Sequence, residues 1–132
     1  MTQEQKNLLL KDLCSRLPYG VKASTKVGGN IKISFIGEDT IIGEDGDSYD
    51  VSFITPYLIP LSSMTIEKKG ECPCGWSMID AWIDGKIYLY EDEELNIDEI
   101  INMLDWLNKN HFDYRNLIPL GIAIDATNLN IY

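Results

Sequence analysis

The chain is poor in positive charge and in histidine. Its 132 residues include 11 Lys and Arg against 21 Asp and Glu, with one histidine, so the formal net charge at pH 7 is −10. Proteins that bind nucleic acids neutralise phosphates with Lys and Arg. The composition therefore argues against direct nucleic-acid binding. A single histidine also offers thin support for histidine-based catalysis.

Long apolar runs and paired cysteines are missing as well. The first residues lack the basic segment and apolar run of a signal peptide, and the longest largely apolar stretch is broken by Pro119 and Gly121. Nothing approaches the roughly 20 apolar residues that span a bilayer. The cysteines are odd in number (Cys14, Cys72 and Cys74), which favours free thiols in a reducing compartment. We therefore predict a cytoplasmic protein with no membrane segment.

Two helices are predicted from apolar residues that recur every three or four positions. The first covers residues 3–16, begins with a capping box formed by Thr2 and Gln5, and ends before Pro18. The second covers residues 97–110, with Asn96 as its N-cap. The stripes predicted to be buried are Leu9, Leu10, Leu13, Cys14 and Leu17 in the first helix and Ile97, Ile100, Ile101, Leu104 and Leu107 in the second.

Between the helices, apolar residues alternate with polar ones in three successive hairpin patterns. The first turns at residues 28–30, the second joins 40–42 to 49–54, and the third covers 78–90. Pro56 and Pro60 limit the intervening segment to an edge strand, followed by a helical turn near 64–69, and 122–124 is a candidate last strand. We predict a single α+β domain over residues 1–132. In it, an antiparallel sheet of about five or six strands, built from hairpins, packs against an N-terminal and a C-terminal helix.

Acidic residues are concentrated in the middle of the chain, where residues 37–105 hold 17 acidic and three basic side chains. Two interpretations stay open. The acidic stretch is a solvated face beside the basic first segment, or it is a recognition surface that steers a basic partner. The candidates for such a surface are Glu44, Asp45, Asp47, Glu91, Asp92, Glu93 and Glu94.

Patterns that would support metal binding or catalysis are weak. Cys72 and Cys74 are the only candidate metal ligands at close spacing, and a structural zinc site needs four ligands. Catalysis by a cysteine–histidine pair would need Cys14 near His111, yet Cys14 lies on a predicted core stripe and no orienting group is evident. We predict no metal and no cofactor. The sequence also argues weakly against enzymatic activity.

The most suggestive segment follows the second helix. It brings aromatic, arginine and histidine side chains together at a helix end, where loops often carry function. The candidate binding residues are Trp106, His111, Phe112, Tyr114 and Arg115. Tyr and Arg are enriched in interface hot spots. The structural alternative is that Arg115 pairs with Asp113 or a helix carboxylate while the aromatic rings pack under the helix.

Three stretches taken together resemble a group of small uncharacterised proteins encoded by gut anaerobes, their prophages and their phages. The stretches are KDLCSRLPYGVK at 11–22, YLIPLSSMT at 57–65 and DWLNKNHFDYRNLI at 105–118. The resemblance implies a mobile-element context and a bacterial host cytoplasm, and it carries no activity. The acidic hairpins and the Cys72–Cys74 segment lie between these stretches and depart from the family pattern, which weakens a metal site.

These observations lead to two functional hypotheses. The first is a non-catalytic acidic accessory protein that binds a protein partner, possessing an anti-defence, nucleic-acid-mimic or immunity-type role. The second is a small-molecule-binding protein or modest enzyme with a pocket near Trp106, His111, Tyr114 and Arg115. The sequence sets neither the identity of the partner nor the oligomeric state.

Overall fold

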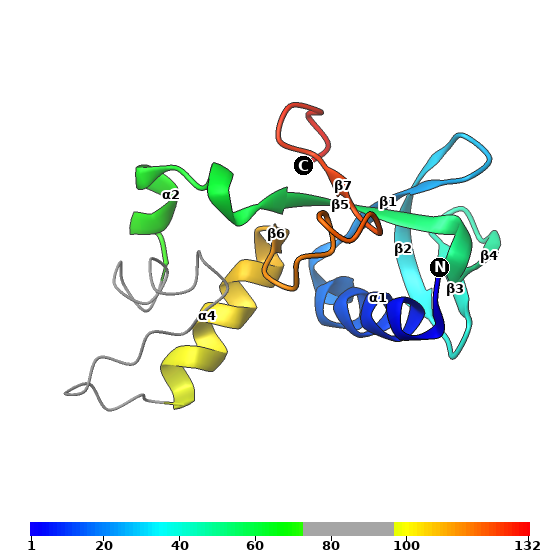
Figure 1. The fold of residues 1–132 in the computed structure, drawn as a ribbon, viewed down its shortest axis with the longest axis horizontal. Coiled ribbons are helices and arrows are strands. Elements are labelled where there is room, and N and C mark those ends of the chain that lie inside the picture. Colours follow the sequence, from blue (N-terminus) through cyan, green and yellow to red (C-terminus); the bar gives the residue numbers. More distant parts are fainter. Residues whose placement is uncertain (73–96) are drawn as a thin grey trace.

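The computed structural model describes residues 1–72 and 97–132 (Figure 1). The first element is helix α1 (Gln3–Arg16), which begins at the predicted capping box. The Thr2 hydroxyl accepts a hydrogen bond from Gln5 N, and the Gln5 side chain accepts one from Thr2 N, both at 3.1 Å. These bonds satisfy two backbone donors at the helix start. A 3-10 turn, η1 (Leu17–Tyr19), then ends at Gly20, whose φ of 72° suits glycine.

A meander of short strands follows α1. It comprises β1 (Lys22–Thr25), β2 (Asn30–Ile36), β3 (Thr40–Gly43) and β4 (Ser48–Asp50). One 3-10 turn, η2 (Val51–Phe53), leads into β5 (Ile54–Pro60), which returns to pair with β1. The order β4-β3-β2-β1-β5 is antiparallel throughout, so the first predicted hairpin is confirmed. The second is confirmed between β3 and β4, but its predicted second strand is too long, because residues 51–53 form η2 and residue 54 begins β5. The third, at 78–90, lies outside the described residues.

The prediction that β5 is an edge strand is wrong. Residues 54–56 pair with β1, whereas residues 57–60 pair with β7 (Ile124–Asp125) and β6 (Phe112–Asp113). Among the strands of residues 1–72 and 97–132, no β5 residue therefore belongs to two ladders, and Pro56 and Pro60 each lie at the end of one. This staggered pairing explains how an internal strand tolerates two residues that lack a backbone N–H.

The sheet also contains parallel pairs that hairpin patterns do not predict. β6 and β7 both run parallel to β5. Parallel pairing needs a long crossover, and the chain between β5 and β6 includes helices α2 (Ile66–Gly70) and α4 (Ile97–Lys109). Thr65 caps α2, as expected for the predicted helical turn. Asn96, the predicted N-cap of α4, lies outside the described residues. The fold is α+β with a mostly antiparallel sheet.

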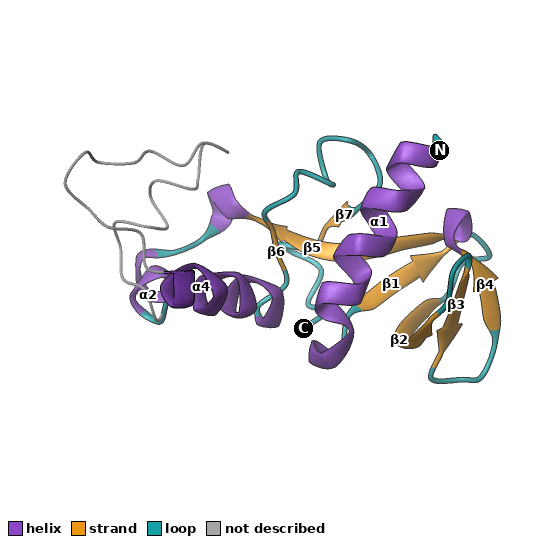
Figure 2. Cartoon of the chain, turned by 90° about the horizontal axis from the view of Figure 1, so that it is seen from below, coloured by secondary structure: helices purple, strands orange, loops and turns teal. Residues whose placement is uncertain are grey.

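Two apolar clusters hold these elements together. The larger lies between the sheet and α1, which crosses one face of the strands (Figure 2). The smaller lies where α4 meets β6 and the chain around α2. The buried members of this smaller cluster are Met64, Cys72, Met103, Trp106, Leu107 and Phe112.

The helix faces differ from the predicted stripes at particular positions. Cys14, predicted to be buried, is exposed, while Asp12 and Arg16 on the same helix are fully buried. Ile101, also predicted to be buried, is 50% exposed. The face of α4 that packs against the core contains Met103 instead, which is 2% exposed. A periodic stripe defines a helix and its approximate face, but the neighbouring elements decide which edge of the stripe is covered.

Within the described ranges, no helix is both long and apolar enough to cross a membrane.

Candidate functional site

Two charged residues of α1 form a pair in the interior. The side chains of Asp12 and Arg16 are both inaccessible to solvent. Arg16 Nε donates to Asp12 Oδ2 at 2.8 Å and Arg16 Nη2 donates to Asp12 Oδ1 at 3.1 Å. Nη2 also donates to the carbonyl of Phe112 at 2.6 Å. Since Phe112 lies on β6, this buried pair joins the first helix to the end of the chain.

Arg115 and Tyr114, two of the predicted binding residues, extend the same network. Arg115 Nε lies 3.3 Å from Asp12 Oδ1, and Arg115 Nη2 donates to Ser15 Oγ and to the Tyr114 hydroxyl, each at 3.2 Å. The Tyr114 hydroxyl in turn donates to Asn108 Oδ1 at 2.9 Å. Arg115 thus pairs with a helix carboxylate, that of α1.

Asp113 has a different role in this segment. Its carboxylate accepts hydrogen bonds from the backbone N of Leu117 and Ile118, both at 2.9 Å. These bonds fix the turn that follows β6. Asp113 itself is buried, so it organises backbone rather than presenting a charge to solvent.

Trp106 and Phe112 lie in the smaller apolar cluster. Their rings stack with centroids 5.7 Å apart and an angle of 27° between planes. Trp106 is 9% exposed and Phe112 is 3% exposed. Their contribution is therefore mainly to the packing of α4 against β6.

His111 is buried and neutral. It has a left-handed backbone with φ of 61°, and its ring stacks on Tyr132 with centroids 3.6 Å apart and planes within 9°. The pKa of His111 is lowered from 6.5 to about 4. Burial is the main cause, and the positive charges of Arg16 and Lys22 add to it. Its Nδ1 atom is buried without a hydrogen-bond partner within the described part of the chain.

Tyr132 is a member of this site that sequence reasoning missed. Its hydroxyl accepts a hydrogen bond from Lys22 N and donates one to the Tyr57 carbonyl, both at 2.9 Å. Burial raises the pKa of Tyr132 to about 12. Tyr132 lies 110 residues from Lys22 along the chain, and no local pattern signals a contact between such distant residues.

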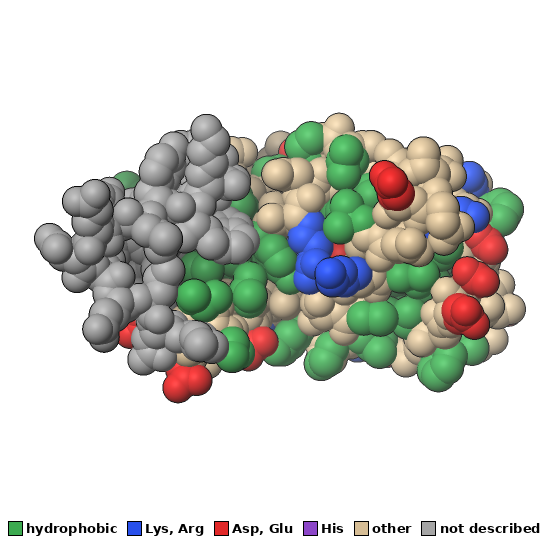
Figure 3. Space-filling model, turned by 60° about the horizontal axis from the view of Figure 1, so that its bottom comes forward, with side chains coloured by type: hydrophobic (Ala, Val, Ile, Leu, Met, Phe, Trp, Pro, Cys, Tyr) green, Lys and Arg blue, Asp and Glu red, His purple; other side chains and the backbone are tan. Residues whose placement is uncertain are grey.

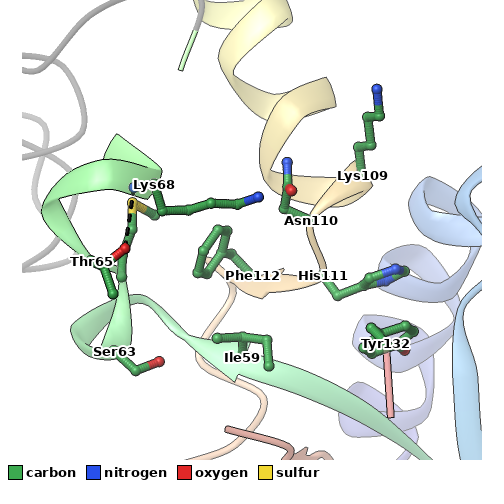
Figure 4. A pocket seen from close by; sticks show the side chains of 10 residues that line it. Ile59, Ser63, Thr65, Lys68, Lys109, Asn110, His111, Phe112 and Tyr132 are labelled. Atoms are coloured by element: carbon green, nitrogen blue, oxygen red, sulfur yellow. Dashed lines mark hydrogen bonds between the residues drawn. The ribbon is translucent and has the colours of Figure 1, made fainter. Parts of the chain in front are cut away.

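A cavity of about 500 Å³ lies between the end of β5, α2 and the end of α4 (Figure 4). His111 and Phe112 line it, together with Lys68, Lys109 and Tyr132. The other three predicted binding residues (Trp106, Tyr114 and Arg115) are not part of its lining. The cavity is therefore displaced from the predicted pocket, toward residues that the sequence did not single out.

The described part of the predicted acidic surface is the turn between β3 and β4. Glu44, Asp45 and Asp47 are all exposed there. Glu44 lies 3.3 Å from the ammonium of Lys32, and Asp45 Oδ1 accepts a hydrogen bond from Asp47 N at 3.0 Å. The pKa of Tyr49 is raised, mainly by burial and to a smaller extent by the negative charges of Asp45 and Asp47. The other candidates, Glu91, Asp92, Glu93 and Glu94, lie outside the described residues.

Acidic side chains gather at the end of the molecule that carries β2, β3 and β4 (Figure 3). At the middle of the same view, Lys and Arg side chains lie close together among apolar ones. Lys and Arg side chains also lie at the acidic end, where Lys32 pairs with Glu44, and further acidic side chains lie at the opposite end of the molecule (Figure 3).

The cysteines do not assemble a reactive or metal-binding centre in the described ranges. Cys72 is buried and Cys74 lies outside these ranges. No three His, Cys, Asp or Glu side chains of residues 1–72 and 97–132 are grouped so as to hold a metal ion. Cys14 is exposed on α1 while His111 is buried, so their environments are unlike those of a paired nucleophile and base.

Comparison with known proteins assigns no family. The chain matches no protein-family model, no curated protein and no solved structure.

Proposed function

We propose that this chain is a non-catalytic accessory protein of phage or mobile-element origin that binds a basic protein partner in the bacterial cytoplasm. The observation that carries the proposal is the exposed acidic turn between β3 and β4. Glu44, Asp45 and Asp47 all reach solvent there, on a chain with a net charge of −10. Such a surface accelerates encounter with a positively charged partner and disfavours negatively charged ones.

Neutralisation within the molecule is slight at this turn. Among the described residues, the ion pair at this turn joins Glu44 to Lys32, and their side chains are 59% and 46% exposed. Exposed pairs of this kind contribute about 0–1 kcal/mol, because water screens them and both side chains lose freedom. Most of the negative charge of the turn is therefore available to a partner.

The loop residues support the non-catalytic part of the proposal. Tyr114 and Arg115 direct their polar groups to Ser15, Asn108 and Asp12. Side chains satisfied within the protein in this way stabilise the fold. A catalytic set would instead place its polar groups at a cavity where a substrate is bound.

Affinity capture from a bacterial host lysate tests this proposal. The wild-type chain is compared with the triple variant Glu44→Gln, Asp45→Asn and Asp47→Asn. The control variant removes the same number of charges from exposed positions elsewhere, through Glu67→Gln, Glu99→Gln and Asp105→Asn.

We expect a stoichiometric partner to be captured at low salt by the wild type and by the control. The turn variant should capture it weakly, and high salt should release it because salt screens exposed charges. Equal capture by the turn variant and the control would overturn the proposal, as would repeated failure to recover a stoichiometric partner.

A second candidate function is small-molecule binding, and the cavity beside His111 favours it. Its volume of about 500 Å³ lies within the usual range of ligand sites. A small molecule that binds there should raise the thermal midpoint of the wild type. It should not raise the midpoint of Ser63→Trp, in which the larger side chain fills the cavity. Stabilisation that persists in the filled variant would contradict it.

A further inference from the structure

The charged side chains that line the cavity beside His111 are all positive among the described residues. Lys68 and Lys109 both contribute to it, and no Asp or Glu does so among the described residues. This is unexpected in a chain with 21 acidic and 11 basic side chains. Positive charge in a concave site raises the local concentration of anions, because low-dielectric walls focus the field.

Both lysines are available to an anion. Lys68 Nζ lies 3.0 Å from Glu71 Oε2, but the Glu71 side chain is 60% exposed, so this pair competes weakly with a ligand. Lys109 is exposed and makes no ion pair within residues 1–72 and 97–132. Figure 4 shows Lys68 extending from α2 toward Asn110 and Phe112, whereas Lys109 points outward from the end of α4.

Hydroxyl groups beside the lysines add neutral hydrogen-bonding capacity. Thr65 Oγ1 accepts a hydrogen bond from Lys68 N at 3.2 Å, which leaves its hydroxyl proton free to be donated. Ser63 already donates to the Pro60 carbonyl at 2.8 Å and retains acceptor capacity. Thr65 can therefore donate to a ligand oxygen.

The remainder of the cavity is apolar or aromatic. Ile59 and Met64 contribute aliphatic surface, and Phe112 and Tyr132 contribute rings. Phe112 is held in place by its stacking on Trp106, and Tyr132 by its stacking on His111. Phe112 is 3% exposed and Tyr132 is 47% exposed, so the Tyr132 ring supplies most of the aromatic surface. Because its stacking on His111 fixes this ring before a ligand arrives, the entropic cost of binding is lowered.

We propose that this cavity binds a small molecule that carries a phosphate group on an apolar body. Lys68 and Thr65 hold the phosphate, Lys109 adds a second positive charge to the lining, and the wall that includes Ile59 and Tyr132 contacts the apolar body. This inference deepens the second candidate function and rests on it. It is independent of the acidic turn and its protein partner.

The inference is tested by titrating the protein with three simple probes at low salt. Binding of each probe is measured from the NMR chemical shifts of the protein. Phenyl phosphate has both features, phenol lacks the phosphate, and inorganic phosphate lacks the apolar body. We expect phenyl phosphate to bind at least about tenfold more tightly than either of the others, because it gains both the charge-assisted hydrogen bonds and the apolar burial that each of the other probes makes only in part.

Paired variants identify the site of binding. The Lys68→Gln, Lys109→Gln variant should bind phenyl phosphate about tenfold or more weakly, because the charge-assisted hydrogen bond from Lys68 and the positive charge of Lys109 are both lost. The control variant, Lys6→Gln with Lys11→Gln, changes the net charge equally on α1 and should bind as the wild type does. Equal thermal midpoints for the two variants establish that both are folded.

Each contrary result has a separate meaning. Equal binding of phenol and phenyl phosphate would overturn the phosphate inference while leaving small-molecule binding in place. Equal binding of inorganic phosphate would overturn the role of the apolar body. No binding of any probe, or equal weakening by both double variants, would overturn the inference for this cavity.

Discussion

Replacing Asp12 with alanine would remove the carboxylate that two guanidinium groups share. Asp12 and Arg16 are both fully buried, and Asp12 accepts two hydrogen bonds from Arg16 at 2.8 and 3.1 Å. Arg115 Nε lies 3.3 Å from the same carboxylate. In the variant, Arg16 keeps its bond to the Phe112 carbonyl but is left as an uncompensated buried charge.

The expected loss is about 3–5 kcal/mol of unfolding free energy, the usual cost of removing one partner from a buried ion pair. Domains of ordinary stability have about 5–15 kcal/mol in total, so the variant should be close to the limit of folding. For a chain of this length, the corresponding fall in the thermal midpoint is about 10–25 °C.

Urea unfolding followed by circular dichroism measures the loss directly. Lys11→Ala is the matched control, because Lys11 is exposed on the same helix and its truncation should change stability by less than about 0.5 kcal/mol. The m-value should stay constant in both variants if folding stays two-state.

A further comparison separates a buried-charge penalty from a loss of packing. In Asp12→Leu with Arg16→Met, both charges are replaced by apolar side chains, and this double variant should be more stable than Asp12→Leu alone. A loss below about 1 kcal/mol in Asp12→Ala, or strict additivity in the double variant, would refute the argument that the pair is a buried and coupled unit.

Two other predictions concern the stacked pair at the end of the chain. The pKa of His111 is lowered from 6.5 to about 4, so the folded state resists protonation of this ring. The unfolding free energy should therefore be greatest above pH 6.5 and should fall by roughly 3 kcal/mol as the pH is lowered to 4, at about 1.4 kcal/mol per pH unit. Unfolding free energies measured between pH 4 and 7 should show a weaker slope in His111→Asn, which tolerates the left-handed backbone; an unchanged slope would assign the loss to other groups. Tyr132→Phe removes the partner of Lys22 N and of the Tyr57 carbonyl, so it should cost about 1 kcal/mol in urea unfolding, and a midpoint equal to that of the wild type would contradict this.

Local patterns in the sequence determined the helices and the first two hairpins. Thr2 and Gln5 determine where α1 begins because both of their capping bonds join residues three positions apart. The predicted turn around residues 28–29 likewise lies in the connection 26–29 between β1 and β2, and such a short connection allows only an antiparallel pair. These contacts form between near neighbours, and near neighbours can be identified from the sequence alone.

The tertiary structure alone decided the position of β5 and the membership of the candidate site. Pro56 and Pro60 suggested an edge strand, but the short strands β6 and β7 reach the free half of β5 from more than 50 residues away in the sequence. Such pairing depends on a crossover that no local pattern specifies.

The same distinction explains the charged and aromatic residues. Asp12 and Arg16 are polar in any sequence profile, yet they are buried because Arg115 and the Phe112 carbonyl meet them from the far end of the chain. Tyr132 stacks on His111 and bonds to β1 and β5 for the same reason. Burial of a polar group is favourable only where distant partners satisfy it, and those partners are brought together only by the complete fold.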